Sequence, residues 1–260
     1  MENKIPIRFF IITFLWSWLS IGIAIIIAHL NPDFLIMKSG IGLLLMIIGA
    51  CGPAIGAIIS IYTIRGKNQL KIFIKSFFSL KFGWKTWITI FLVLGGASFI
   101  AWILPEFSGK DRIQTNLPSV YIFPIYLLLM IFLGGGQEEI GWRGYIMPYL
   151  EKKFGLVIGG FILGIVWAIW HLPLWFVPGS PQIYLNFFAF ILGAIGYSYF
   201  FSWVIKASGN RLFSGLVVHG AGNAFYALFP AWDWILKIII LIIGIIIVIT
   251  RTYKSKKYIA

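Results

Sequence analysis

Two adjacent glutamates, Glu138 and Glu139, lie in an otherwise apolar stretch of the sequence, and Arg143 follows about one helical turn later. The whole chain has only eight acidic residues. Ionisable side chains within apolar segments are costly, and they commonly mark a functional site. His171 and His219 also fall within apolar segments. The sequence therefore predicts a polar site inside a bundle of apolar helices.

The spacing Glu-Glu-x-x-x-Arg predicts different roles for the two glutamates. Glu139 and Arg143 are separated by four residues, so on a helix that begins after the glycine run 134–136 they share a face and are expected to form an ion pair. Glu138 is rotated by about 100° from Glu139, which leaves it free for proton transfer. The alternative is that all three residues form one buried ion-pair cluster that fixes helix packing.

His171 is expected to lie level with Glu138. If the chain forms an antiparallel helical hairpin that closes at residues 152–155, the two residues are separated from the turn by similar numbers of residues, and their heights agree within about one helical turn. Trp167 lies four residues before His171. The alternative for His171 is a histidine that serves only packing.

His219 and Asn223 are also four residues apart, and Gly220 and Gly222 beside them allow a neighbouring helix or an extended peptide to approach closely. An imidazole and a carboxamide on one helical face form a donor pair that suits a developing oxyanion. The alternative is that both residues make hydrogen bonds between helices.

The composition indicates an all-α, polytopic membrane protein. Hydrophobic residues make up 60% of the chain, charged residues only 11%, and the mean hydropathy is +0.94. We expect residues 1–260 to form a single integral membrane domain with no soluble domain, because a helix of about 20 apolar residues spans a bilayer. Eight transmembrane helices are predicted, at residues 7–29, 41–64, 84–104, 121–149, 156–172, 185–204, 212–229 and 234–250.

The net charge of +13 follows from this topology. Alternate threading of the eight spans places most Lys and Arg residues on one side, so by the positive-inside rule both termini are expected in the cytoplasm, and the bacterial plasma membrane is the expected location. Lysines at four-residue intervals in segment 65–85 predict an amphipathic helix on the cytoplasmic surface, with a basic loop as the alternative. Membrane lipid is therefore an expected partner, and nucleic acid is not.

The three motifs together resemble the CPBP family, which includes the type II CAAX prenyl endopeptidases and bacterial bacteriocin-processing or abortive-infection proteins. The family pattern is Glu-Glu-x-x-x-Arg, then Phe-x-x-x-His, then His-x-x-x-Asn or Asp, on a bundle of about eight transmembrane helices. This chain matches the first and third motifs, but Trp167 stands where the family has phenylalanine, and the resemblance implies that it is an aromatic packing residue. The resemblance covers roughly residues 121–229, which are expected to carry the catalytic core.

The resemblance implies intramembrane hydrolysis of a peptide or lipidated peptide. In that interpretation Glu138, aided by His171, activates a water molecule, and His219 and Asn223 hold the tetrahedral oxyanion. Glu139, Arg143 and Trp167 then support the catalytic residues. The single cysteine excludes an intramolecular disulfide, and no histidine lies near it in the sequence, so a cysteine nucleophile is not supported.

The metal dependence and two other function classes stay open. Glu138, His171 and His219 have the types needed for three zinc ligands, but the helical His-Glu-x-x-His signature is missing, so no cofactor is expected and a metal-free mechanism is favoured. A non-catalytic immunity or interaction protein that binds a bacteriocin is one alternative. A proton-coupled transporter is the other, although the chain shows no inverted repeat.

Overall fold

The computed structural model describes residues 5–31, 33–34, 36–80, 82–231 and 233–257. Every regular element within these ranges is helical, so the predicted all-α fold is confirmed. The α-helices are α1 (Ile7–Leu30), α2 (Gly40–Ala50), α3 (Gly52–Phe77), α4 (Trp84–Ile103), α5 (Phe123–Phe132), α6 (Glu139–Gly141), α7 (Met147–Trp170), α8 (Phe187–Ala207), α9 (Phe213–Leu228) and α10 (Asp233–Lys257). The short elements are η1 (Ile36–Lys38), η2 (Leu104–Ser108), η3 (Val120–Ile122), η4 (Gly136–Glu138), η5 (Trp142–Ile146), η6 (Leu172–Phe176) and η7 (Pro181–Tyr184), of which η5 is a π-helix.

The lengths and compositions of the helices are those of an integral membrane protein. Among the described residues, four helical stretches are long and apolar enough to cross a membrane, and α2 and α3, which are bent by 42° relative to one another, pass the same test as a pair. The predicted spans 121–149 and 156–172 lie within one of these stretches, and residues 234–250 form a shorter apolar helix. The count of eight spans therefore stays a prediction. The four stretches are Ile7–Leu30, Trp84–Ser108, Val120–Phe176 and Phe187–Ala207.

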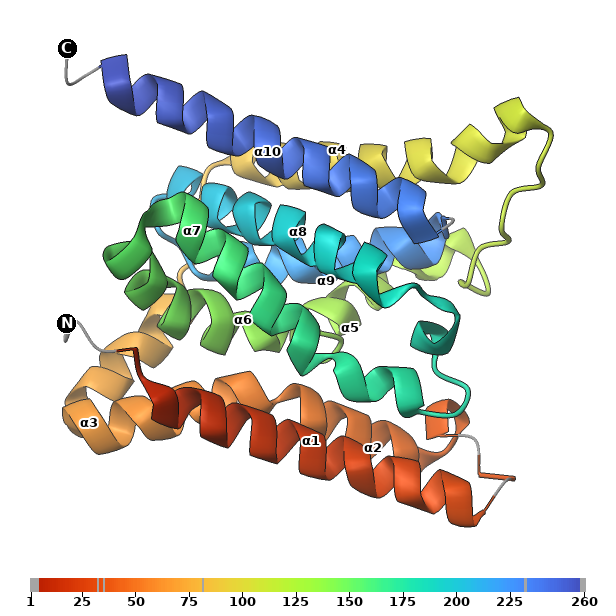
Figure 1. Ribbon diagram of the computed structural model, residues 1–260, viewed down its shortest axis with the longest axis horizontal. Coiled ribbons are helices and arrows are strands. Elements are labelled where there is room, and N and C mark those ends of the chain that lie inside the picture. The colour runs from red at the N-terminus through yellow and green to blue at the C-terminus, as the bar shows by residue number, and fades with distance from the viewer. Residues whose placement is uncertain (1–4, 32, 35, 81, 232, 258–260) are drawn as a thin grey trace.

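The helices form a bundle in which the middle of the chain is enclosed by its two ends (Figure 1). Helices α1, α2 and α3 lie along one side, α4 and α10 along the other, and α5 to α9 lie between them. Helix α1 begins and α10 ends at the same end of the bundle (Figure 1). The cytoplasmic location of this end stays a prediction. Lys4 and Lys81, which contributed to the predicted charge asymmetry, lie outside the described residues.

Two glycines reverse the chain sharply at this end of the bundle. Gly155 has φ 76° and ψ 170° within α7, and Gly66 has φ 79° and ψ 173° within α3. Residues that have a Cβ rarely adopt such positive φ values, so glycine suits both positions. Beyond Gly155 the chain returns antiparallel to residues 139–154, and a Cβ on Gly159 would lie 3.0 Å from the Leu150 carbonyl carbon. The predicted hairpin is confirmed.

The amphipathic helix predicted for residues 65–85 is shorter than expected. The second arm of α3, after Gly66, is helical and exposes its lysines, but it ends at Phe77, and the next helix begins at Trp84. Phe77 and Phe82 are both buried in the hydrophobic core. The chain therefore leaves the surface helix between them, because a continuous helix along the surface would not bring both rings inward.

Close helix packing positions the segment that carries the glutamates. A Cβ on Gly141 would collide with the backbone carbonyl of Pro53, and a Cβ on Gly220 would collide with Ile131. These contacts bring α6 against α3 and α9 against α5 at distances that larger residues would not permit. The close approach that the sequence predicts at Gly220 is therefore confirmed.

Candidate active site

The polar site begins at the glycine run that precedes the two glutamates. Gly135 has a φ of 123°, a conformation available mainly to glycine, and a Cβ at this position would collide with Nε2 of His219. The run therefore allows the backbone before Glu138 to lie directly against an imidazole from α9. Glu138 then ends η4, and Glu139 opens α6, as the sequence predicts for a helix that starts after the glycines.

A π-helix follows the glutamates and carries Arg143. Pro148 lies at the start of α7 and has no backbone N–H to donate to the carbonyl four residues earlier, so the regular hydrogen-bond ladder is interrupted there. Residues Trp142–Ile146 take up the wider π geometry just before this interruption. Such single-turn π segments within α-helices are frequent at functional sites.

Glu138 is buried and faces residues from the returning arm of the hairpin. The indole Nε1 of Trp167 donates a hydrogen bond of 2.9 Å to Oε2 of Glu138. The His171 Nε2 atom lies 3.9 Å from the same oxygen. The level placement of Glu138 and His171 predicted from the hairpin is confirmed.

The proton arrangement of His171 follows from its second contact. Its Nδ1 lies 2.8 Å from the backbone carbonyl oxygen of Trp167. A carbonyl oxygen only accepts, so Nδ1 carries the proton, and in the neutral ring Nε2 is then a proton acceptor. The acceptor face of His171 is therefore directed at Glu138.

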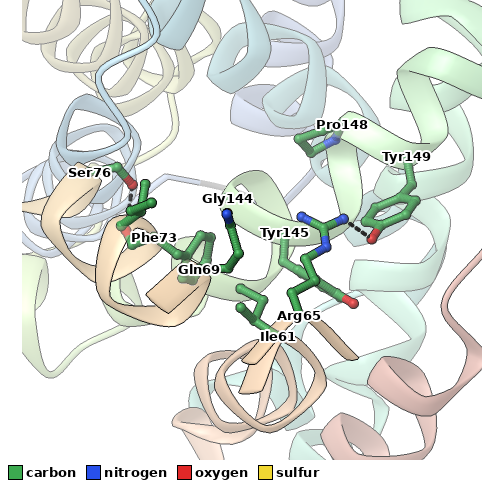
Figure 2. Close-up of a pocket in the computed structure, with 10 residues that line it drawn as sticks. Ile61, Arg65, Gln69, Phe73, Ser76, Gly144, Tyr145, Pro148 and Tyr149 are labelled. Atoms are coloured by element: carbon green, nitrogen blue, oxygen red, sulfur yellow. Dashed lines mark hydrogen bonds between the residues drawn. The ribbon is translucent and has the colours of Figure 1, made fainter. Parts of the chain in front are cut away.

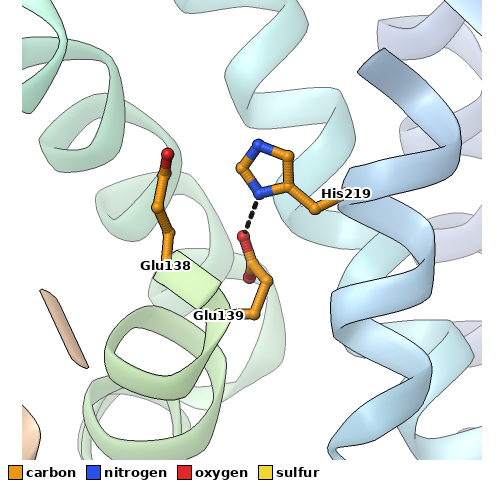
Figure 3. A group of neighbouring side chains, drawn as sticks. All are labelled: Glu138, Glu139 and His219. Carbon is orange, nitrogen blue, oxygen red and sulfur yellow. Dashed lines mark hydrogen bonds and ion pairs between the residues drawn. The ribbon is translucent and has the colours of Figure 1, made fainter. Parts of the chain in front are cut away.

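Glu139 forms the centre of a second, fully buried group of charges. Nη1 of Arg143 lies 3.1 Å from Oε1 and 2.9 Å from Oε2 of Glu139, which confirms the predicted ion pair. His219 joins the pair, because its Nδ1 lies 2.7 Å from Oε1 of Glu139 (Figure 3). The Arg143 guanidinium lies over the rings of Trp167 and Phe201, at 4.6 Å and 4.1 Å from their centroids. Cation–π contacts of this kind stabilise a desolvated guanidinium.

Asn223 contacts the glycine run from the same helix as His219. Its Nδ2 donates a hydrogen bond of 2.7 Å to the carbonyl oxygen of Gly134. Unlike His219, which is buried, Asn223 is exposed. The polar face of α9 therefore lies along the backbone that leads into Glu138, with His219 buried and Asn223 exposed.

The structure also places three possible metal ligands together. Ligand atoms of Glu138, Glu139 and His219 all lie within 4.8 Å of one another. This group contains Glu139 where the sequence suggests His171. Carboxylate oxygen and imidazole nitrogen suit zinc, but here Glu139 is already engaged by Arg143 and by Nδ1 of His219. A metal bound through those atoms would displace both contacts.

The structure brings all the candidate residues into one cluster, from η4, α6, the π-helix, the end of α7 and α9. Several contacts in it were not anticipated, among them those of His219 with Glu139, of Trp167 with Glu138 and of Phe201 with Arg143. Trp167 was interpreted only as packing, although a buried indole N–H usually needs an acceptor. Phe201 was missed, because one phenylalanine among 24 has no distinguishing feature. The clustered candidate residues are Glu138, Glu139, Arg143, Trp167, His171, His219 and Asn223.

Comparison with known proteins agrees with the motifs. Residues 119–225 match the family model described as Type II CAAX prenyl endopeptidase Rce1-like. A protein named CAAX prenyl protease 2 from Methanococcus maripaludis is 31% identical over 167 residues, which are 59% of this chain and 62% of that protein. The match thus spans less than two thirds of the length of this relative. Residues 119–225, which hold every candidate residue of the cluster, are therefore similar to the type II CAAX prenyl endopeptidases.

Proposed function

We propose that this protein is an intramembrane endopeptidase in which Glu138 and His171 activate a water molecule. The observation that carries the proposal is the 3.9 Å separation between Glu138 Oε2 and the acceptor nitrogen of His171. This distance is too long for a direct hydrogen bond, yet it lies within the reach of proton transfer through one water. A polar atom from Trp167 fixes the same carboxylate oxygen in place.

In this mechanism the water oxygen attacks the peptide carbonyl carbon, and the carboxylate of Glu138, with His171, accepts a proton from that water. The carbonyl π electrons move to oxygen and give a tetrahedral oxyanion. The intermediate then expels the amine, the C–N bond breaks, and the proton held by Glu138 and His171 passes to the leaving nitrogen. The products are a carboxylic acid and an amine, so one water is consumed for each peptide bond.

His219 and Asn223 are proposed to hold the oxyanion. Because Nδ1 of His219 donates to Glu139, its Nε2 can donate only when the ring carries both protons. The Glu139 carboxylate favours that cation, and Asn223 has a second amide hydrogen besides the one directed at Gly134. Preorganised donors of this type commonly contribute the largest part of transition-state stabilisation.

We prefer the metal-free mechanism because of the contacts that Glu139 already makes within the cluster. A zinc ion beside Glu139 would lie next to the Arg143 cation, and it would compete with both Arg143 and His219 for the same carboxylate. Zinc bound by Glu138, His171 and His219 remains the alternative mechanism. Metal analysis of the purified protein separates the two: stoichiometric zinc whose removal abolishes activity would overturn the metal-free mechanism.

The proposed substrate is a peptide held at the membrane. The names of the matched family and of the archaeal relative refer to prenyl substrates, so a prenylated peptide with a CAAX-type end is the first candidate, and a bacteriocin-like precursor is the second. Either substrate would approach from the bilayer, in agreement with the apolar helices that surround the cluster. The plasma membrane is the proposed location.

The proposal is tested by comparing membrane peptides in cells that carry wild-type protein, Glu138→Gln or Glu151→Gln. Glutamine preserves the size of Glu138 but removes its basic carboxylate. Glu151 is the matched control, since it lies at the other end of the same helical segment and pairs with Lys206. Uncleaved precursors should accumulate with Glu138→Gln alone, and their termini identify the cleaved bond. Identical peptide profiles in all three strains would favour a non-catalytic binding protein.

A further inference from the structure

A cavity of about 300 Å³ lies outside the polar cluster, between α3 and the segment that joins the π-helix to α7 (Figure 2). Its volume falls at the lower end of the range for small-ligand sites. Tyr145 on its wall follows Glu138 by seven residues, a separation of about 10 Å along a helix. The cavity is lined by Ile61, Arg65, Gln69, Ile72, Phe73, Ser76, Gly144, Tyr145, Pro148 and Tyr149, none of which belongs to the cluster.

Arg65 gives this cavity its charge. Its Nη2 donates to the hydroxyl of Tyr149, and the guanidinium lies 5.6 Å from the centroid of the same ring (Figure 2). A guanidinium has five N–H donors in a planar fork, so this contact leaves others able to face a ligand. Gln69 and Ser76 add neutral polar groups, and none of the described residues that line the cavity is acidic. The lining is therefore suited to an anion.

The remaining wall is apolar. Ile61, Phe73 and Pro148 supply hydrocarbon surface beside the guanidinium. A small inorganic anion would leave this surface uncovered, whereas an amphiphile with an anionic head would cover it. The lining therefore has the character of a site for a charged group attached to an apolar body.

The cavity also lies where α3 reverses at Gly66. Lining residues on the second arm of α3 are three or four positions apart, so they share one face, and the exposed lysines 67, 71 and 75 lie on the other face. Lysines near a membrane surface attract anionic lipids without requiring a defined site. Arg65 differs from them because its side chain is held by Tyr149 at the rim of a cavity.

We propose that this cavity binds a phosphate group, and that the head of an anionic phospholipid supplies it. Arg65 provides the planar, charge-assisted donors that phosphate oxygens prefer, the Gln69 amide provides a further donor, and the apolar wall contacts the glycerol and first acyl carbons. A soluble phosphate ester presents the same group and would use the same donors. The inference does not depend on the proposed protease activity.

The test uses the full-length protein in neutral detergent. Native mass spectrometry measures retained lipid after incubation with phosphatidylglycerol or phosphatidylcholine, and thermal unfolding is measured with and without inorganic phosphate. Arg65→Gln removes the proposed ligand-binding charge. Lys71→Gln is the matched control, since it removes one positive charge from the same arm of α3 at a residue outside the cavity. Arg65→Lys and Tyr149→Phe both keep a positive charge at position 65, and they replace Arg65→Gln in the test if that variant fails to fold.

Wild-type protein should retain phosphatidylglycerol in preference to phosphatidylcholine, and Arg65→Gln should weaken this retention about tenfold or more through loss of charge-assisted hydrogen bonds. Lys71→Gln should stay close to wild type, and Arg65→Lys and Tyr149→Phe should show intermediate losses. A phosphate-induced rise in unfolding temperature that requires Arg65, without selective lipid retention, would support the phosphate site but overturn its lipid source. Equal losses in Arg65→Gln and Lys71→Gln, or no Arg65-dependent binding of either probe, would overturn the proposal.

Discussion

Residues 139–154 carry an ion pair near each end, and the two pairs lie in opposite surroundings. At the start, Glu139 and Arg143 are almost fully enclosed, since each side chain is only 1% exposed. Near the end, Glu151 pairs with Lys206 of α8, and their side chains are 23% and 38% exposed. Both are pairs of a glutamate with a cation, and they differ in burial and in the neighbours that surround them.

The buried pair is held by several neighbours, whereas the exposed pair has water beside it. His219 donates to Glu139, and two aromatic rings cover the guanidinium of Arg143. Removing one charge from such a group leaves the other desolvated and uncompensated, whereas water replaces a missing partner at the surface. Burial, more than the identity of the paired residues, therefore determines how much the structure depends on a pair.

The largest effect on stability is expected from Glu139→Gln. This change leaves the Arg143 cation buried without its counter-charge, and the free energy of unfolding should fall by about 3 kcal/mol or more. Reversible unfolding in mixed micelles gives the difference from wild type. If the free energy of unfolding fell by less than about 1 kcal/mol, the buried pair would contribute no more to stability than a typical surface pair. The proposed difference between the two ion pairs would then be wrong.

Trp167→Phe should have a smaller and more selective effect. Phenylalanine, the residue of the family pattern, keeps an aromatic ring beside Arg143 but removes the N–H that donates to Glu138. We expect kcat to fall about tenfold with little change in KM, because a hydrogen bond to a charged group contributes about 1.5–3 kcal/mol and this one positions the proposed base. The assay follows cleavage of a peptide identified by the membrane comparison.

Trp102→Phe is the matched control for this variant. The Trp102 indole donates to the carbonyl oxygen of Ile113, outside the polar cluster, so its loss should leave kcat unchanged. Equal activity of Trp167→Phe and wild type would show that Trp167 contributes packing alone, as the sequence first suggested. An increase in KM with unchanged kcat would instead indicate a role in substrate binding.

The contacts that could be predicted from the sequence are those set by local geometry. Glu139 and Arg143 meet because helical neighbours four residues apart share a face. Glu138 and His171 are level because both arms of the hairpin start from one turn and rise at the same rate per residue. In each case a residue count is sufficient, because a single helix or a single turn connects the partners.

The contacts that escaped prediction depend on how distant helices rotate and pack. Residue spacing does not specify which face of α9 meets α6, so the hydrogen bond between His219 and Glu139, 80 residues apart, could not be anticipated. The Arg65 cavity depends likewise on the reversal at Gly66 and on the distant segment that includes Tyr149. The length of the surface helix was overestimated. The spacing of the lysines indicates an amphipathic helix, but it does not indicate where the chain must turn inward so that Phe82 packs in the core.

Glu151→Gln should have the smallest effect and sets the scale for the others. Glu151 and Lys206 are partly solvated, so exchange of the carboxylate for an amide should lower the free energy of unfolding by less than about 1 kcal/mol and leave cleavage unchanged. The difference from wild type should shrink further at high salt, since exposed charges are screened. Unfolding at two salt concentrations checks both expectations. If Glu151→Gln lowered the free energy of unfolding as much as Glu139→Gln does, the exposed pair would be as important for stability as the buried pair. Burial would then not explain how much the structure depends on each pair.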